Sequence, residues 1–201
     1  MANPSLAHQT TVKCILRYLA GTKDLRITYR KPQQSQSHLE LLHGFADAAY
    51  VNNSDYCSTS GYVFIVGGGA ITWGSRKQTS VALSSTEAEY VALSEATQES
   101  KWLQMLYEEL GFEQNYPIPL FGDNQGSFMM VNNPQFHKRS KHIEIRQHWV
   151  REQIKKKSIE LQDCWDPENT ADVLMKQLMP EKHRKHTKGL GLIWLKGSVS
   201  N

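Results

Sequence analysis

The segment Ser84-Ser85-Thr86-Glu87-Ala88-Glu89-Tyr90-Val91-Ala92-Leu93 predicts the start of a long helix that carries a carboxylate without an evident structural role. Ser84 and Glu87 have the spacing of a capping box, in which each side chain bonds a free backbone amide of the first turn. Glu89 is two residues further on and points to nearly the opposite side of the helix. On this segment alone, the simplest interpretation is a partly exposed Glu89 at the edge of an apolar stripe.

Behind Glu89, apolar residues continue at helical spacing as far as a glycine that makes a natural C-terminal stop. These residues are Leu93, Ala96, Leu103, Leu106 and Leu110, and the glycine is Gly111. Glu89 therefore lies about a turn and a half inside the helix, close to its apolar stripe.

The composition limits the class of protein. A chain of 201 residues is one ordinary domain, or one domain with an appendage. No apolar run approaches the length of a membrane span, and the polar first residues do not resemble a signal peptide, so we expect no membrane partner. The three cysteines, Cys14, Cys57 and Cys164, are too far apart for a zinc motif or a disulfide framework, which favours a reducing, intracellular location.

The first part of the chain predicts a helix, a strand and a linker. Residues 11–20 are amphipathic and end at Gly21, and residues 25–29 have the composition of a short strand. The polar segment 31–38 reads as a linker. We therefore divide the chain into the tail of a preceding unit at 1–37, a main domain at 38–180 and a basic C-terminal tail at 181–201.

Strands dominate the start of the main domain. Residues 39–47 form the first strand candidate, and a polar loop is expected at 48–60. The runs 61–66 and 70–73 flank three glycines and predict a hairpin. Three glycines could also cradle a phosphate, but that loop requires a helix after it, and a β-type run follows here.

The remainder alternates between strands and helices. Strands are predicted at 117–121 and 159–165, and helices at 125–132, at 141–157 and at 169–178, the last beginning at Asn169 and ended by Pro180. Three strands, a long helix and then further strands and helices describe an α/β fold, with a mixed sheet flanked by helices.

Four acidic residues stand out: Asp47 and Asp123 end strands, Glu89 lies in the long helix, and Asp172 lies in the first turn of the last helix. Each has an ordinary structural explanation. Asp47 could form a turn, and Asp123 could cap the helix after it. Asp172 could be a first-turn acid that the helix dipole favours. Taken one by one, these explanations are sufficient.

Taken together, the acids predict one site. If the strands that carry Asp47 and Asp123 are neighbours, their ends meet at one sheet edge, where the long helix could also direct Glu89. Gathered carboxylates repel one another unless a cation lies among them. Hard Mg²⁺ or Mn²⁺ is the expected cation, and two such ions about 3.5–4 Å apart are the usual clamp for displacement at a phosphodiester.

Seven short stretches carry a resemblance to a known family. They are Phe45-Ala46-Asp47-Ala48, Ser58-Thr59-Ser60-Gly61-Tyr62-Val63-Phe64, Trp73-Gly74-Ser75-Arg76-Lys77-Gln78, the segment from Ser84 to Leu93, Gly122-Asp123-Asn124-Gln125, His137-Lys138-Arg139-Ser140-Lys141-His142-Ile143 and Thr170-Ala171-Asp172. With the acid order Asp–Glu–Asp–Asp, this combination resembles the ribonuclease H domain of copia-type (Pseudoviridae) retrotransposon Pol polyproteins, over about residues 12–191.

The resemblance implies a ribonuclease H-like fold with a mixed five-stranded sheet, and an endonuclease that cuts the RNA strand of RNA–DNA hybrids during reverse transcription. It implies that Asp47, Glu89, Asp123 and Asp172 are catalytic and bind two Mg²⁺ or Mn²⁺ ions. Residues 14–22 resemble the end of the reverse transcriptase part, which is therefore an expected partner besides the hybrid. The expected location is the cytoplasm, including virus-like particles, or the nucleus.

Two departures from the family pattern stand out. The family usually has a second acid two residues after the first, where this chain has Ala49. Cellular ribonucleases H often carry a mobile histidine shortly before the last acid, and the segment between Trp165 and Asp172 contains none. We expect a modest effect from the first departure and altered product release from the second.

Basic and polar residues suggest where nucleic acid binds. Residues 137–157 contain eight Lys or Arg against two Glu, which favours phosphate contacts over an ordinary solvated helix face. The expected contacts are Lys138, Arg139, Lys141, His142 and Arg146, although His142 could instead be a metal ligand or a hydrogen-bonded loop histidine.

Ser85, Asn124 and Gln125 could read 2′-hydroxyl groups, and capping or turn formation explains them equally well. A second basic cluster at 182–188, with His183 and His186, is interpreted as tail.

Two rival functions follow from the same residues. The first is a non-catalytic nucleic-acid-binding or structural module derived from a retroelement; intact acids argue against decay without proving activity. The second is an integrase-like recombinase on the same fold, but that class ends its acid order with Asp–Asp–Glu.

Overall fold

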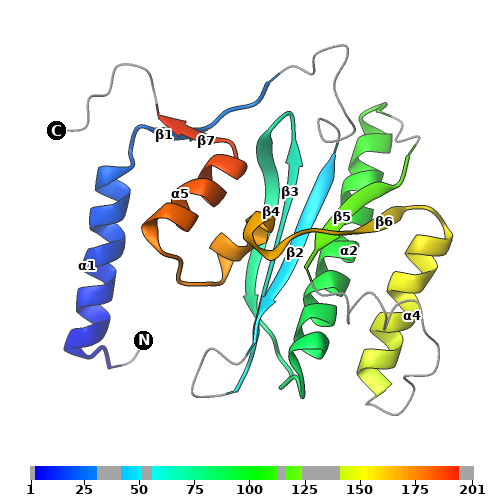
Figure 1. The fold of residues 1–201 in the computed structure, drawn as a ribbon, viewed down its shortest axis with the longest axis horizontal. Coiled ribbons are helices and arrows are strands. Elements are labelled where there is room, and N and C mark those ends of the chain that lie inside the picture. Colours follow the sequence, from blue (N-terminus) through cyan, green and yellow to red (C-terminus); the bar gives the residue numbers. More distant parts are fainter. Residues whose placement is uncertain (1–2, 31–41, 51–55, 113–115, 124–140, 195–201) are drawn as a thin grey trace.

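The computed structural model describes residues 3–30, 42–50, 56–112, 116–123 and 141–194 (Figure 1). The five-stranded sheet has the order β4-β3-β2-β5-β6, and a second sheet pairs β1 with β7. The strands are β1 (Leu25–Ile27), β2 (His43–Ala49), β3 (Thr59–Val66), β4 (Gly69–Lys77), β5 (Ile118–Gly122), β6 (Ile159–Asp163) and β7 (Leu192–Trp194). The α-helices are α1 (Leu6–Gly21), α2 (Ser85–Glu109), α4 (Lys141–Lys155) and α5 (Pro180–Gly189), and two 3-10 helices are η2 (Asp166–Glu168) and η3 (Thr170–Leu174).

The central strand β2 makes the sheet mixed. It pairs antiparallel with β3, where Asp47 lies opposite Gly61, and parallel with β5, where Phe45 lies opposite Phe121. β5 in turn pairs parallel with β6. The predicted α/β class with a mixed five-stranded sheet is therefore confirmed. Because β2 and β5 run in the same direction, the residues at their carboxyl ends lie at the same edge of the sheet.

The helix α2 packs against β2 and β3 and is itself covered by α4 (Figure 1). Its stripe of buried side chains, including Tyr90, Leu93 and Leu103, meets Phe64 of β3 and Leu120 of β5 in the main core. Each of these five side chains is at most 3% exposed, and burying one such side chain contributes about 1.5–3 kcal/mol. The apolar periodicity of α2 thus fixes how the helix lies on the sheet.

The N-terminus of α2 differs in one detail from the predicted capping box. The Ser84 hydroxyl accepts a hydrogen bond from the Glu87 amide at 3.2 Å, as predicted. The Glu87 carboxylate, however, accepts from the amide of Leu83 at 3.0 Å rather than from that of Ser84. Glu87 still serves the first turn, so Glu89 is the glutamate left for another role. At the other end Gly111 follows the helix with φ +78°, which confirms the predicted stop.

Several predicted boundaries were wrong. The expected loop at 48–60 is shorter, because β2 continues to Ala49 and β3 begins at Thr59. The expected helix at 169–178 is only the 3-10 helix η3, and Pro180 begins α5 instead of ending a helix. Proline is well suited to a first helical position, since its missing N–H is not needed there. The predicted linker at 31–38 and the helix at 125–132 lie outside the described residues, and the division into domains stays a prediction.

The small sheet joins two segments that lie far apart in the sequence. β1 pairs antiparallel with β7, with Leu25 opposite Trp194, and α1 and α5 lie beside it (Figure 1). Among the helices in the described ranges, none has both the length and the apolarity that a membrane crossing requires.

A buried asparagine joins η3 to the central strand. Asn169 is fully buried, and its side-chain amide donates to the Ala46 carbonyl of β2 at 3.0 Å. Its side-chain oxygen accepts from the Ala171 amide at 3.2 Å and caps η3. Both contacts hold η3, and therefore Asp172, against the end of β2.

We expect Asn169→Ala to lower the free energy of unfolding by about 2–3 kcal/mol, because it leaves the Ala46 carbonyl and the Ala171 amide without these partners in a buried place. Urea unfolding followed by circular dichroism measures this loss. Asn3→Ala, at an exposed position, is the matched control and should change stability by less than about 0.5 kcal/mol. Equal stability of the two variants would contradict the anchoring role.

Candidate metal centre

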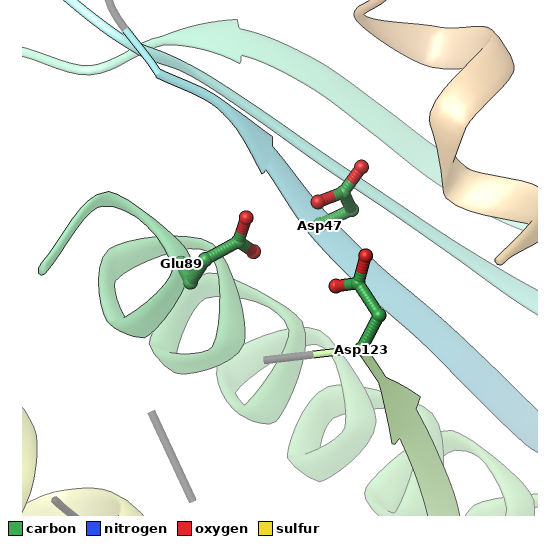
Figure 2. Close-up of side chains that lie close together, drawn as sticks. All are labelled: Asp47, Glu89 and Asp123. Carbon is green, nitrogen blue, oxygen red and sulfur yellow. The ribbon is translucent and has the colours of Figure 1, made fainter. Parts of the chain in front are cut away.

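Three acidic side chains from different elements converge at one edge of the sheet. Asp47 comes from β2, Glu89 from α2, and Asp123 from the residue just after β5, and the three carboxylates point toward one another (Figure 2). One oxygen from each lies within 4.8 Å of the other two. The parallel pairing of β2 with β5 brings the two aspartates together, and the packing of α2 on β2 adds the glutamate.

A single backbone amide orients two of these acids. The N–H of Ala48 donates to Asp47 Oδ1 at 2.7 Å and to Glu89 Oε2 at 3.0 Å. Asp47 is fully buried, whereas Glu89 and Asp123 are partly exposed. The acidic group is therefore held from the protein side and reached by solvent from the other.

The fourth predicted acid lies beside Asp47, outside the group of three. Asp172 in η3 is 1% exposed and shares a lysine partner with Asp47. Lys176 connects the two, because its ammonium lies 2.7 Å from Asp47 Oδ2 and 2.7 Å from Asp172 Oδ1. Sequence reasoning missed Lys176; the available signal was its spacing of four residues from Asp172, which places the two on one face of a helical turn.

Burial and crowding disturb the protonation of these carboxyl groups. Burial, together with the hydrogen bond to Asp172, raises the pKa of Asp47 to about 7, although Lys176 acts against this. Burial and the neighbouring charge of Asp47 raise the pKa of Glu89 to about 10. Burial also acts to raise the pKa of Asp172, but hydrogen bonds with Asp47 and Lys176 outweigh it and lower that pKa. Without a bound cation, the acidic group therefore retains protons at neutral pH.

This donor set fits a hard divalent cation. Carboxylate oxygens are the ligands that Mg²⁺ and Mn²⁺ prefer, and three of them are already gathered at one point. Burial first, and then the neighbouring carboxyl groups, raise the pKa values of Asp47 and Glu89, and Lys176 offsets this only in part. A divalent ion would replace the protons and complete the neutralisation.

Of the predicted nucleic-acid contacts, two have described side chains. Ser85 is exposed as the first residue of α2. Arg146 in α4 lies 3.9 Å from Glu95 of α2 and is partly buried. Asn124, Gln125, Lys138 and Arg139 lie outside the described residues, and the same holds for the side chains of Lys141 and His142 at the start of α4. Ser85 thus lies near the acids, because it is four residues before Glu89 on the same helix. Arg146 instead pairs with Glu95 of α2.

One of the two histidines of the predicted basic tail, His186, lies near the site. His186 in α5 is 1% exposed, and its charge would act on Asp172. The interpretation of this residue as part of a tail was therefore wrong, since α5 packs against η3. Its burial sets it apart from a mobile solvent-facing histidine.

Comparison with known proteins gives two kinds of match. No protein-family model matches the chain. The retrovirus-related Pol polyprotein from transposon RE2 of Arabidopsis thaliana is 34% identical over 194 residues, which are 96% of this chain and 13% of the relative. The corresponding polyprotein from transposon TNT 1-94 of Nicotiana tabacum is 37% identical over 177 residues, 88% of this chain and 13% of the relative. The chain thus corresponds to a small part of these polyproteins.

Solved structures agree on the fold. LC11 ribonuclease H1, isolated from compost, aligns with a TM-score of 0.51 and 17% identity over 73% of this chain and 97% of its own. A foamy viral protease–reverse transcriptase in complex with an RNA/DNA hybrid aligns with a TM-score of 0.52 and 15% identity over 75% of this chain and 21% of its own. These likenesses concern the fold alone. The chain is therefore homologous, over most of its length, to a segment of copia-type Pol polyproteins from plant transposons, and it has a ribonuclease H-like fold.

Proposed function

We propose that this domain hydrolyses the RNA strand of RNA–DNA hybrids, with divalent metal ions, as part of retrotransposon reverse transcription. The observation that carries the proposal is the convergence of Asp47, Glu89 and Asp123 at one open edge of the sheet. Homology to Pol polyproteins supports the biological setting. The fold shared with a viral enzyme bound to an RNA/DNA hybrid supports the substrate class.

The residues present divide into two sets of ligands that share Asp47. Asp47, Glu89 and Asp123 would hold one ion, and Asp47 with Asp172 would hold the other. When bound, such a pair of ions activates the attacking water and stabilises the leaving 3′ oxygen, so that the products carry a 5′-phosphate and a 3′-hydroxyl. No residue of the chain has to form a covalent intermediate.

The contribution of the protein is position and charge. The Ala48 amide orients Asp47 and Glu89 together, and the paired strands β2 and β5 keep Asp123 beside them. Carboxylates that are held by main-chain contacts need little rearrangement at the moment of reaction, which is how preorganised sites accelerate a reaction. The buried position of Asp47 on the central strand makes it the acid with the least freedom to move.

Substrate contacts extend the proposal to the surface around the acids. Ser85 is exposed one helical turn before Glu89, where it can reach the sugar edge of a nucleotide held at the site. The basic segment that leads into α4, together with Asn124 and Gln125, would supply phosphate and 2′-hydroxyl contacts. The reverse transcriptase part of the same polyprotein is the proposed protein partner.

We expect Asp47→Asn and Asp123→Asn each to reduce metal-dependent cleavage of a labelled RNA–DNA hybrid by at least about 100-fold, because each removes a ligand charge from the site. Circular dichroism should show an unchanged fold. Asp24→Asn, which alters an acid outside the group, is the matched control and should cleave like the unmodified chain. Cleavage retained by either site variant would refute the assignment, and hybrid binding without cleavage by the unmodified chain would favour the non-catalytic module.

We expect the stabilisation by Mg²⁺ to increase from about pH 5.5 to about pH 8. The raised pKa values of Asp47, about 7, and Glu89, about 10, mean that the folded, metal-free chain binds more protons than the unfolded chain. Their contribution to stability is therefore complete below about pH 4 and is lost as the pH rises through the raised values. Bound metal has to displace those protons, so its effect is largest towards the alkaline end, where they are lost most readily.

Thermal unfolding in EDTA and in saturating Mg²⁺, at both ends of this pH range, measures the effect. The shift in Tm should be greater at the alkaline end, and Asp47→Asn should flatten its dependence on pH. A shift of the same size at both ends would show that the acids do not exchange protons for metal.

A further inference from the structure

A lysine side chain lies where two of the four acids meet. The Lys176 ammonium is 2.7 Å from Asp47 Oδ2 and 2.7 Å from Asp172 Oδ1. Both carboxylates are almost completely buried, whereas 31% of the lysine side chain is exposed. Short contacts from an ammonium to carboxyl oxygens are charge-assisted, and burial of the acceptors reduces their screening by water. The ammonium therefore acts as a counter-ion inside the acidic group.

The local chain holds Lys176 in this place. Its amide donates to the Asp172 carbonyl at 3.0 Å, and Asn169 fixes the start of η3 against β2. The Met175 side chain packs over Gly61, which lies opposite Asp47 on β3. The backbone hydrogen bond of Lys176, the Asn169 cap and the packing of Met175 thus hold the lysine close to the two acids. A lysine that reaches an acid across open solvent has no such support.

The two oxygens of Asp47 have different partners. Oδ1 accepts from the Ala48 amide, which also orients Glu89, and Oδ2 pairs with Lys176. The lysine therefore occupies the side of Asp47 that faces Asp172. An ion shared by Asp47 and Asp172 would have to take the place of the Lys176 ammonium. The two cannot occupy it together, because a divalent cation and an ammonium in contact with the same carboxylates repel each other.

We propose that Lys176 is a positioning residue that competes with the second of two divalent ions. The first ion binds at Asp47, Glu89 and Asp123, and the second binds between Asp47 and Asp172 only after the Lys176 ammonium has moved away. This inference rests on the proposed metal-dependent function. It makes ion binding sequential, and it keeps Asp47 and Asp172 together while no metal is bound.

A purely structural ion pair would behave differently. In that case, removal of the lysine would lower stability in the absence and in the presence of metal and would leave the affinities for the ions unchanged. Competition also predicts lower stability without metal, but it differs in two outcomes: the stability is recovered when the ions bind, and the second ion binds more tightly.

The test compares Lys176→Met with Lys156→Met in the full chain without nucleic acid. Lys156 is a good match because it follows the end of α4 and also pairs with an acid four residues away, Glu152, at 2.6 Å. Calorimetric titration with Mn²⁺ gives the affinities, and electron paramagnetic resonance of free Mn²⁺ counts the ions. We expect Lys176→Met to bind the second ion at least about tenfold more tightly, as removal of a competing conformer requires. Lys156→Met should match the unmodified chain.

Unchanged affinity for the second ion in Lys176→Met would overturn the competition while leaving the metal site intact. Failure of the unmodified chain to bind any Mn²⁺ would overturn the proposed function and this inference together. The two proposals therefore fail in distinguishable ways.

A second measurement needs no variant and applies if Lys176→Met does not fold. Acetic anhydride labels exposed lysine amines, and mass spectrometry of peptides measures the labelling of Lys176 in the unmodified chain. Its labelling should increase at the Mn²⁺ concentration at which the second ion binds, because the ammonium is released, while labelling of Lys156 stays constant. Constant or decreasing labelling of Lys176 would overturn the proposal.

Discussion

The parallel pairing of β2 with β5 is the constraint on which the rest of this structure depends. It places the carboxyl ends of two strands at one edge of the sheet, and those ends carry Asp47 and Asp123. The rest of the site is arranged around these two aspartates. The helix α2 packs on β2 and places Glu89 beside them, and a hydrogen bond from Asn169 holds η3 against β2. A change of strand order would separate acids that local sequence alone does not hold together.

The pairing brings buried carboxyl groups close together, and three kinds of positive charge offset their repulsion. Burial makes charged Asp47 and Glu89 costly, and both retain protons in the metal-free state. The ammonium of Lys176 neutralises the Asp47–Asp172 side. A divalent ion would relieve the remainder. Protons, ammonium and metal thus act on the same carboxylates, so proton release, the position of the lysine and ion binding are physically linked.

Much of the fold could be predicted from periodicity. The long helix, its start at Ser84 and the hairpin around three glycines follow from apolar spacing and turn residues, which act over a few positions. The region after β6 was predicted poorly. Asn169 does begin a helical element there, but its other hydrogen bond goes to Ala46 in a distant strand, and Pro180 opens a helix that periodicity alone did not show. Local patterns carry no information about such distant partners.

For the site, the sequence by itself determined which residue types are available and that Asp47, Glu89 and Asp123 follow elements able to meet at one sheet edge. Only the tertiary structure decided that Asp172 lies beside Asp47 and that Lys176 lies between them. The reason is physical: neighbours on one helical turn are set by helix geometry, whereas the approach of η3 to β2 depends on packing at Gly61 and on a buried hydrogen bond to Ala46. Those contacts exist only when the whole sheet has formed.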